Sequence, residues 1–263
     1  MTAGVEVERR TALLAATDLA RSFGGVPAVD GVSFGVAAGE VVGLIGPNGS
    51  GKSTTVNMLS GSLRSDAGKI TLEGHDITSK PSHKVAELGL ARTFQIPRVW
   101  GKLTVAENLL VAGTRLEDET ASRALFRRRQ LRVRQEELET RLTEILAVVR
   151  LAQLADQPAE FLSGGQKRLL EFGRIMMSRA KVLVLDEPFA GVNPVLCREL
   201  QDVIESLRLD GCAVLLVEHN LQAVEESCSR VLVMATGRVI AQGTLAEVRA
   251  DEGVIGAYLG VAS

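Results

Sequence analysis

The sequence predicts an α/β fold with a mostly parallel sheet and an inserted helical subdomain, and three observations support this prediction. Short, uninterrupted apolar runs lie at 41–45, 182–185 and 213–217, as expected of parallel strands that are buried on both faces. Residues 94–166 contain no strand-like run and are expected to be mostly helical. Alternating helix and strand patterns return at 167–251, which is typical of a helical segment inserted into an α/β core.

We therefore expect one domain over 12–251, with a core made of 12–93 and 167–251, a helical insert at 94–166 and a C-terminal tail at 252–263. No internal repeat is visible and each motif occurs once. Two identical active sites would therefore require two chains.

Composition and charge narrow the possible partners. The 263 residues include 30 basic and 32 acidic side chains, a net charge of −2, which gives no electrostatic footprint for nucleic acid. Three cysteines without metal-type spacing indicate a reducing compartment and no structural disulfide: Cys197, Cys212 and Cys228. The charged N-terminus does not resemble a signal peptide, and no run approaches the ~18 apolar residues of a membrane helix. Any role at a membrane would depend on a partner that spans the bilayer.

The apolar run at 41–45 leads into a glycine-rich loop that matches G-x-x-x-x-G-K-[ST]. Its glycines let successive backbone N–H groups converge on phosphates, and the pattern at 52–59 predicts a helix that leaves the loop. We expect Lys52 to reach the β- and γ-phosphates and the Ser53 hydroxyl to ligate Mg²⁺. The sequence thus predicts a phosphate-loop NTPase core with this nucleotide-binding loop: Gly46, Pro47, Asn48, Gly49, Ser50, Gly51, Lys52, Ser53 and Thr54.

Two carboxylates follow the apolar run at 182–185, and Pro188 ends that strand. Ligands of open α/β sheets bind at the carboxyl edge of the strands, where these carboxylates are expected. Asp186 is placed to hold Mg²⁺ through its water shell, and Glu187 to orient and polarise the attacking water.

A second phosphate-binding turn is predicted at Ser163-Gly164-Gly165-Gln166, which Leu162 precedes. Ser163 can cap the following helix, and the two glycines let backbone amides approach a phosphate closely. The positive end of the helix dipole would favour the same anion.

Three further residues are candidates for contact with the nucleotide. Gln95 follows a strand end and can reach Mg²⁺ or the attacking water, and His219 follows the strand at 213–218. Phe23 either stacks on adenine or belongs to the core. His75 and His83 are interpreted as structural.

The chain resembles the ATP-binding cassette (ABC) ATPases over roughly residues 12–259. The phosphate loop, Gln95, the 162–166 motif, the Asp186-Glu187 strand, the turn at 190–194 and His219 occur in the order of that family. The resemblance implies ATP and Mg²⁺ as cofactors. It also implies a head-to-tail homo- or heterodimer, in which each ATP lies between loop 46–54 of one subunit and 163–166 of the other. Asn193 stands where the family most often has aspartate, which leaves its cross-interface role open.

Three function classes compete: the ATPase subunit of a membrane transporter, a soluble ABC protein of translation or DNA repair, and another phosphate-loop enzyme. Soluble ABC proteins usually carry two cassettes or a very long coiled-coil insertion, and GTPases carry an Asn-Lys-x-Asp guanine reader. None of these features is present in the sequence. A transporter ATPase is therefore favoured.

The transported substrate is inferred from local resemblance to the branched-chain amino acid uptake group. The stretches at 92–97, 103–109, 190–194, 217–220 and 257–260 follow its pattern, and the polar insert at 115–140 resembles the larger of its two cassettes. Urea or amide uptake and lipopolysaccharide export are the alternatives. The resemblance implies two integral membrane permease subunits, indirect coupling to an extracytoplasmic substrate-binding protein, and a peripheral position on the cytoplasmic face of the inner membrane.

Two segments of the helical insert are candidate contact surfaces. Residues 115–150 alternate basic and acidic side chains, which predicts a solvated, ion-paired helix, with contact to anionic lipid headgroups as the alternative. The loop after Gln95 offers apolar side chains to a membrane partner, unless Trp100 packs inside the insert. Those side chains are Ile96, Pro97, Val99, Trp100 and Leu103.

Overall fold

The computed structural model describes residues 12–93, 99–114, 128–251, 253–254 and 256. The chain folds into two compact units. The first comprises 1–95, 180–191 and 204–263, and the second comprises 96–179 and 192–203. Each unit is thus assembled from segments that are distant in the sequence.

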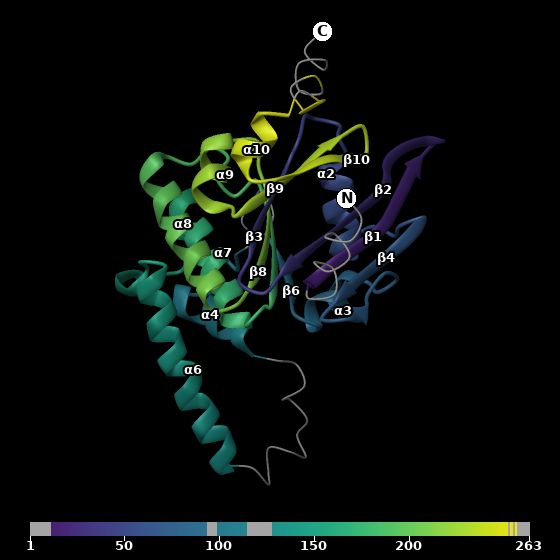
Figure 1. Ribbon diagram of the computed structural model, residues 1–263. Coiled ribbons are helices and arrows are strands. Elements are labelled where there is room, and N and C mark those ends of the chain that lie inside the picture. Colours follow the sequence, from purple (N-terminus) through teal and green to yellow (C-terminus); the bar gives the residue numbers. More distant parts are fainter. Residues whose placement is uncertain (1–11, 94–98, 115–127, 252, 255, 257–263) are drawn as a thin grey trace. The chain divides into compact units, whose positions relative to one another are not determined.

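A six-stranded sheet forms the centre of the first unit, in the order β10-β9-β3-β8-β7-β6 (Figure 1). Five neighbouring strands run parallel, and β10 pairs antiparallel with β9. The predicted α/β fold with a mostly parallel sheet is thereby confirmed. The strands are β3 (Val41–Ile45), β6 (Leu90–Arg92), β7 (Val182–Asp186), β8 (Ala213–Val217), β9 (Arg230–Ala235) and β10 (Arg238–Gly243).

A second, four-stranded sheet of this unit is antiparallel, in the order β2-β1-β4-β5. Its pairings contain several register shifts. The sequence indicated strands in this region without separating them into a second sheet. The strands are β1 (Ala12–Phe23), β2 (Val26–Ala37), β4 (Ala67–Leu72) and β5 (His75–Asp76).

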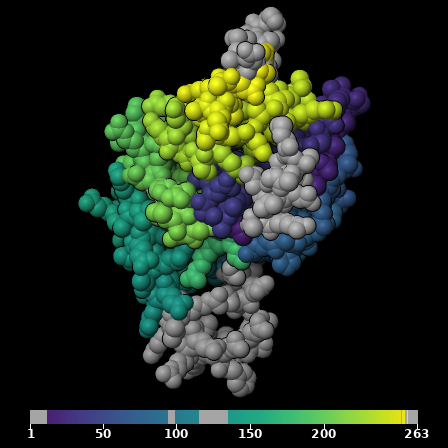
Figure 2. All heavy atoms as spheres, viewed as in Figure 1, coloured from purple at the N-terminus to yellow at the C-terminus, as the bar shows by residue number. Residues whose placement is uncertain are grey.

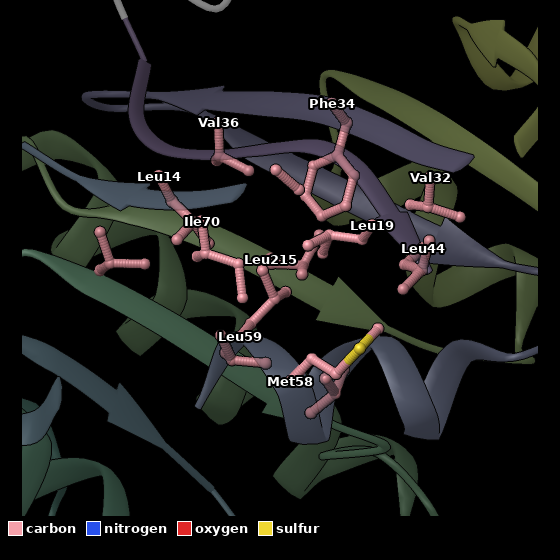
Figure 3. Packing of buried hydrophobic residues seen from close by; sticks show 14 of the residues in the cluster. Leu14, Leu19, Val32, Phe34, Val36, Leu44, Met58, Leu59, Ile70 and Leu215 are labelled. Atoms are coloured by element: carbon pink, nitrogen blue, oxygen red, sulfur yellow. The ribbon is translucent and has the colours of Figure 1, made fainter. Parts of the chain in front are cut away.

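The hydrophobic core of the first unit joins the two sheets through one helix. Buried side chains of α2 (Lys52–Leu59), among them Met58 and Leu59, contact a cluster that includes Leu14 of β1 and Leu215 of β8 (Figure 3). This packing holds α2 against the central sheet, and α2 follows directly on the glycine-rich loop that leaves β3. Burial of each such side chain contributes about 1.5–3 kcal/mol.

Three shorter helices complete the first unit: α3 (Ser82–Glu87), α9 (Leu221–Ser227) and α10 (Leu245–Arg249). Val224 of α9 and Val248 of α10 join a second apolar cluster with Ile45 of β3. At the surface, β10 lies beside β2 (Figure 2). Arg238 of β10 pairs with Asp30 of β2. These contacts place the C-terminal strand next to the N-terminal sheet.

The second unit is helical in its described residues. It contains α4 (Val105–Gly113), α6 (Arg128–Val148), η2 (Ala152–Leu154), η3 (Ala159–Phe161), α7 (Gly164–Ser178) and the first part of α8 (Pro194–Leu209). Its apolar interior includes three fully buried side chains: Leu109 of α4, Phe172 of α7, and Val149, which follows α6. A Cβ on Gly173 would meet Leu109 at 2.9 Å, so α4 and α7 lie in close contact.

The second unit continues past the predicted insert boundary at residue 166. It includes all of α7 up to Arg179, because the apolar face of α7 is buried within this unit together with α4 and α6. The sequence could not indicate this boundary, since an amphipathic helix does not reveal which partner covers its apolar face. As a functional division, the insert at 94–166 and the tail at 252–263 remain predictions.

Candidate functional site

The predicted phosphate loop connects β3 to α2, and backbone sterics require glycine at two of its positions. Gly46 and Gly51 have φ values of 150° and 102°. A Cβ on Gly46 would lie 2.1 Å from the Met234 carbonyl oxygen, and one on Gly51 would lie 2.4 Å from the Ala28 carbonyl oxygen. The glycines therefore allow β9 and β2 to approach the loop as closely as they do.

Lys52, the first residue of α2, is buried. Its ammonium group donates hydrogen bonds to the carbonyl oxygens of Gly46, at 2.7 Å, and Pro47, at 2.9 Å. Burial lowers the pKa of Lys52, an effect partly opposed by the nearby carboxylates of Glu187 and Asp186. The loop therefore holds a positive charge at its centre, as expected of an anion-binding site.

A cleft of about 540 Å³ opens beside the loop within the first unit. Phe23, at the end of β1, lines this cleft and is 48% exposed, so it is not a core residue. The Arg21 guanidinium lies over its ring, 5.0 Å from the centroid. The cleft is lined by Phe23, Ala28, Asn48, Gly49, Ser50, Gly51, Lys52, Ser53, Thr54, Arg92, Asp186, Glu187 and Val217.

Asp186 is held by an ion pair that the sequence did not predict. Arg92, at the end of the neighbouring strand β6, donates to Asp186 Oδ2 at 2.9 Å, and both side chains are largely buried. The same guanidinium also donates to Asn57 at 2.7 Å and to Ser60 at 3.2 Å. Arg92 thus links the end of α2 to the carboxyl edge of the sheet. Its position directly beside the Gln95 motif was the only available signal.

Glu187 and His219 come together at the same edge of the sheet, as their positions after β7 and β8 predicted. His219 Nδ1 lies 3.7 Å from Glu187 Oε1. Glu187 has a left-handed backbone with φ 49°, and its N–H donates to the Val217 carbonyl at 2.9 Å. A side chain other than glycine adopts this conformation at a cost of about 1–3 kcal/mol, and such residues cluster at functional sites.

Glu218 is a fully buried carboxylate that was not among the residues predicted from the sequence. It accepts hydrogen bonds from the backbone N–H groups of Phe189, His219 and Asn220. Burial raises the pKa of Glu218, and these three hydrogen bonds act in the opposite direction. A charged residue at the end of an otherwise apolar strand was the signal in the sequence, because such a group is buried only with partners.

The second predicted phosphate-binding turn lies in the helical unit. Ser163 and Gln166 form a capping box at the start of α7, which confirms the predicted cap. Gln166 N–H donates to Ser163 Oγ at 3.3 Å, and Ser163 N–H donates to Gln166 Oε1 at 2.9 Å. A Cβ on Gly164 would meet no atom within 4 Å, whereas one on Gly165 would meet Leu196 at 2.6 Å.

The remaining candidates have separate outcomes. Gln95 lies outside the described residues. Asn193 Oδ1 accepts from Leu196 N–H at 2.9 Å at the start of α8. His75 and His83 are exposed and do not line the cleft. None of the three cysteines, which all lie among the described residues, forms a disulfide. Over the described part of the chain, no cluster of three or more His, Cys, Asp or Glu side chains could hold a metal ion by itself, and no helix is long and apolar enough to span a bilayer.

Trp100 belongs to the helical unit and is 43% exposed. The Arg174 guanidinium of α7 covers one face of its ring, 3.9 Å from the centroid. Trp100 is therefore neither fully exposed nor packed inside the insert. Its backbone is fixed by the buried side chain of Asn108, which accepts from Trp100 N–H and donates to its carbonyl oxygen.

Comparison with known proteins identifies relatives along nearly the whole chain. The family described as ABC transporter matches residues 29–190, and the family described as branched-chain amino acid ATP-binding cassette transporter matches residues 238–263. A probable branched-chain amino acid transport ATP-binding protein of Archaeoglobus fulgidus is 42% identical over 94% of this chain and 95% of its own length. A lipopolysaccharide export system ATP-binding protein of Haemophilus influenzae is 35% identical over 94% of this chain and 97% of its own length.

The fold has equally clear relatives among solved structures. The ADP conformation of an ATP-binding cassette of an ABC transporter matches with a TM-score of 0.78 and 37% identity. The match covers 94% of this chain and 98% of that structure's chain.

Proposed function

Because the chain belongs to the ABC transporter family of ATP-binding proteins, we propose that its ATPase activity powers uptake of branched-chain amino acids. One observation carries this assignment. The A. fulgidus relative, at 42% identity, is named for branched-chain amino acid transport, and so is the family that matches residues 238–263. The lipopolysaccharide export proteins, at 35% identity, support the second candidate function.

The proposed nucleotide site uses the cleft of the first unit. Backbone N–H groups of the loop 46–54 and the ammonium of Lys52 would bind the phosphates. Phe23 presents an exposed ring at the mouth of the same cleft, which suits stacking on adenine. A phosphate oxygen would have to compete with the carbonyls of Gly46 and Pro47 for Lys52.

The residues of the cleft also fit Mg²⁺. Ser53 at the start of α2 and Asp186 at the end of β7 line one cleft and supply hydroxyl and carboxylate oxygens, the donors that Mg²⁺ prefers. Mg²⁺ is commonly held by one or two protein oxygens together with substrate phosphates and water, so no larger cluster is needed. Bound Mg²⁺ would neutralise charge that develops on the phosphates. Gln95 is proposed as a further ligand from the resemblance alone.

Glu187 is the proposed general base, and His219 is the proposed partner at the γ-phosphate. Glu187 lines the cleft with its side chain partly exposed, so it can accept a hydrogen bond from the attacking water. The imidazole of His219 lies beside the Glu187 carboxylate and is itself largely exposed. In the proposed dimer, Ser163, Gly164, Gly165 and Gln166 would contact the ATP that is bound to the other subunit.

We further propose that this subunit works with a second cassette and two integral permease subunits. Substrate would reach these permeases from an extracytoplasmic binding protein, and this chain would lie on the cytoplasmic face of the inner membrane. The proposal follows from the family, whose ATP-binding subunits serve transporters.

Uptake in reconstituted vesicles tests the proposed substrate. The protein is reconstituted into lipid vesicles together with the permease subunits and the second cassette that are encoded next to its own gene. The matching substrate-binding protein is added on the opposite side of the membrane, and ATP is supplied on the side that carries the cassettes. We expect ATP-dependent accumulation of labelled leucine, and no accumulation of urea. ATP-dependent extraction of lipopolysaccharide without leucine uptake would instead support the export function. Accumulation of urea would overturn the amino acid assignment.

A further inference from the structure

Glu218 is a buried charged group to which none of the roles above assigns a function. Its side chain is 1% exposed, and it directly follows β8. Burying a carboxylate is unfavourable unless hydrogen bonds compensate for the lost hydration. The position of those hydrogen bonds therefore indicates what the carboxylate does.

The two oxygens of Glu218 connect two different loops at the carboxyl edge of the sheet. Oε1 accepts from Phe189 N–H at 3.1 Å, in the loop that follows β7 and carries Glu187. Oε2 accepts from the N–H groups of His219, at 3.1 Å, and Asn220, at 3.4 Å, in the loop that follows β8. One side chain thus joins the backbone next to the proposed general base to the backbone of the proposed γ-phosphate histidine.

A second connection lies directly beside this one. Glu187 N–H donates to the carbonyl of Val217, the residue that precedes Glu218. Glu187 is therefore held in its left-handed conformation from both sides, by Val217 through its own N–H and by Glu218 through Phe189. Without such contacts, an unfavourable conformation of this kind would relax.

We propose that Glu218 is a positioning residue that fixes the loops of Glu187 and His219 in one mutual arrangement. The inference rests on the proposed roles of those two residues. Glu218 itself is buried and does not line the cleft, so it acts through them. A misplacement of about 1 Å at a reacting group can cost about 10²-fold in rate, which sets the scale of the expected effect.

The main test replaces Glu218 by glutamine and measures ATP turnover and ATP affinity separately. Glutamine keeps the shape of the side chain but replaces one acceptor oxygen by an NH₂ group, which can only donate. In one of the two loops, this NH₂ group would therefore face backbone N–H groups that have lost their acceptor. We expect Glu218→Gln to lower kcat about 10- to 100-fold while the Kd for ATP stays within about threefold. Glu218→Asp keeps the charge but is one methylene shorter, and kcat should fall with it as well.

Glu40→Gln is the matched control. Glu40 is a largely buried carboxylate in the same unit that accepts from Ala37 N–H at 2.8 Å and pairs with Arg230 at 2.6 Å. It lies just before β3, whereas Arg230 begins the parallel strand β9, so both mark the amino edge of the sheet. This control should lose thermal stability to a similar degree while keeping the wild-type kcat.

Amide hydrogen exchange gives a readout that does not depend on turnover. In Glu218→Gln, exchange at Phe189, His219 or Asn220 should accelerate about tenfold or more, while the amides within β3 keep their protection. The inference would be overturned by any of three results: wild-type kcat in both Glu218 variants, unchanged exchange at all three amides, or an equal loss of kcat in Glu40→Gln.

Two further variants separate this inference from the proposed function. If Glu187→Gln and His219→Ala themselves hydrolyse ATP normally, the proposed roles of those residues are wrong. If both are inactive and Glu218→Gln is not, only the inference about Glu218 is wrong.

Discussion

The charged side chains of the cleft are held by short contacts with one another and with the backbone. Lys52 donates to two loop carbonyls, Asp186 pairs with Arg92, and Glu187 lies beside His219. In a partly buried cleft such contacts are stronger than in water, because the local dielectric constant is lower. Glu187 is the member that we propose as the general base. Replacing one carboxylate oxygen by an NH₂ group would remove this basic function while keeping the shape of the side chain.

Glu187→Gln should bind ATP and lose turnover, because the amide retains the shape but cannot act as a base. We expect steady-state ATP hydrolysis to fall about 10² to 10⁴-fold, with an ATP-bound dimer accumulating. Phosphate release and size-exclusion chromatography with ATP measure the two effects.

Glu73→Gln is the control for Glu187→Gln. Glu73 also has a left-handed backbone, with φ 48°, but it pairs with Lys181 and does not line the cleft. Its substitution should leave hydrolysis unchanged. Normal steady-state turnover in Glu187→Gln would contradict the role assigned to that residue.

At the scale of elements, the two glycine-containing turns have different steric requirements. In the phosphate loop, Gly46 has a left-handed backbone and faces the Met234 carbonyl of β9. In the capping turn of α7, Gly164 begins a helix and has open space where a Cβ would lie. The phosphate loop therefore requires glycine at position 46, whereas the capping turn has room for a side chain at position 164.

Gly46→Ala should therefore destabilise the protein and abolish ATP binding, while Gly164→Ala should not destabilise it. The added methyl group at Gly46 has to displace backbone, with an expected loss of at least about 2 kcal/mol of unfolding free energy. Alanine at Gly164 is expected to change this free energy by less than about 1 kcal/mol, in the stabilising direction. Chemical denaturation and ATP titration test both variants. Equal unfolding free energies for the two variants would show that this steric role of Gly46 is wrong.

At the scale of the whole molecule, the two predicted phosphate-binding turns of each chain lie in two separate compact units. Lys52 belongs to the first unit and Ser163 to the second. If the proposed dimer forms, the Ser163 turn contacts the nucleotide that is bound to the other subunit. A substitution at Lys52 of one subunit and a substitution at Ser163 of the other would then affect the same composite site.

Mixing Lys52→Ala subunits with Ser163→Arg subunits should restore ATPase activity that neither variant has alone. A mixed dimer has one composite site with both lesions and one with neither. Phosphate release from the mixture measures the rescue, and mixed dimers are verified by differential tags.

The control for this mixture combines Lys52→Ala with a subunit that carries both substitutions, because every composite site then has at least one lesion. No rescue is expected in the control. If verified mixed dimers of the two single variants are also inactive, Ser163 does not act in trans. Should the natural partner be a different cassette, that cassette has to carry one of the substitutions.

Trp100 is the residue that we propose as a contact for a membrane partner. It is 43% exposed, Arg174 covers one face of the ring, and Asn108 holds the Trp100 backbone. We expect Trp100→Ala and Val99→Asp to leave the basal ATPase activity nearly intact, while association with the permease subunits and leucine uptake decrease about tenfold or more. Co-purification and vesicle uptake measure the loss.

Leu209→Ala is the control for the Trp100 variant, because Leu209 is an exposed apolar residue of the other unit. It should retain wild-type uptake. Wild-type transport by the Trp100 and Val99 variants would reject this contact surface. Ile96 and Pro97, which belong to the same predicted surface, lie outside the described residues.

The sequence by itself determined the central sheet, the phosphate loop and the edge of the sheet where the cleft lies. Parallel strands buried on both faces appear as continuous apolar runs, so β3, β7 and β8 were visible directly. The residues that follow those strands meet at one edge by geometry alone, which explains why Lys52, Asp186 and Glu187 line one cleft and why His219 lies beside Glu187. Local signals were also sufficient for the cap at Ser163.

Only the tertiary structure decided which side chains hold that site together. Arg92 meets Asp186, and Glu218 meets Phe189, through pairings between strands and loops that are distant in the chain. No local pattern encodes such pairs, because a buried charge is recognisable in a sequence only as an unexpected polar residue whose partner is unknown. The same reason applies to the boundary of the helical unit, since the apolar face of α7 does not specify which helices cover it. The sequence therefore predicted the phosphate loop and the two carboxylates that line the cleft, whereas the tertiary structure added Arg92 and decided how these groups are held.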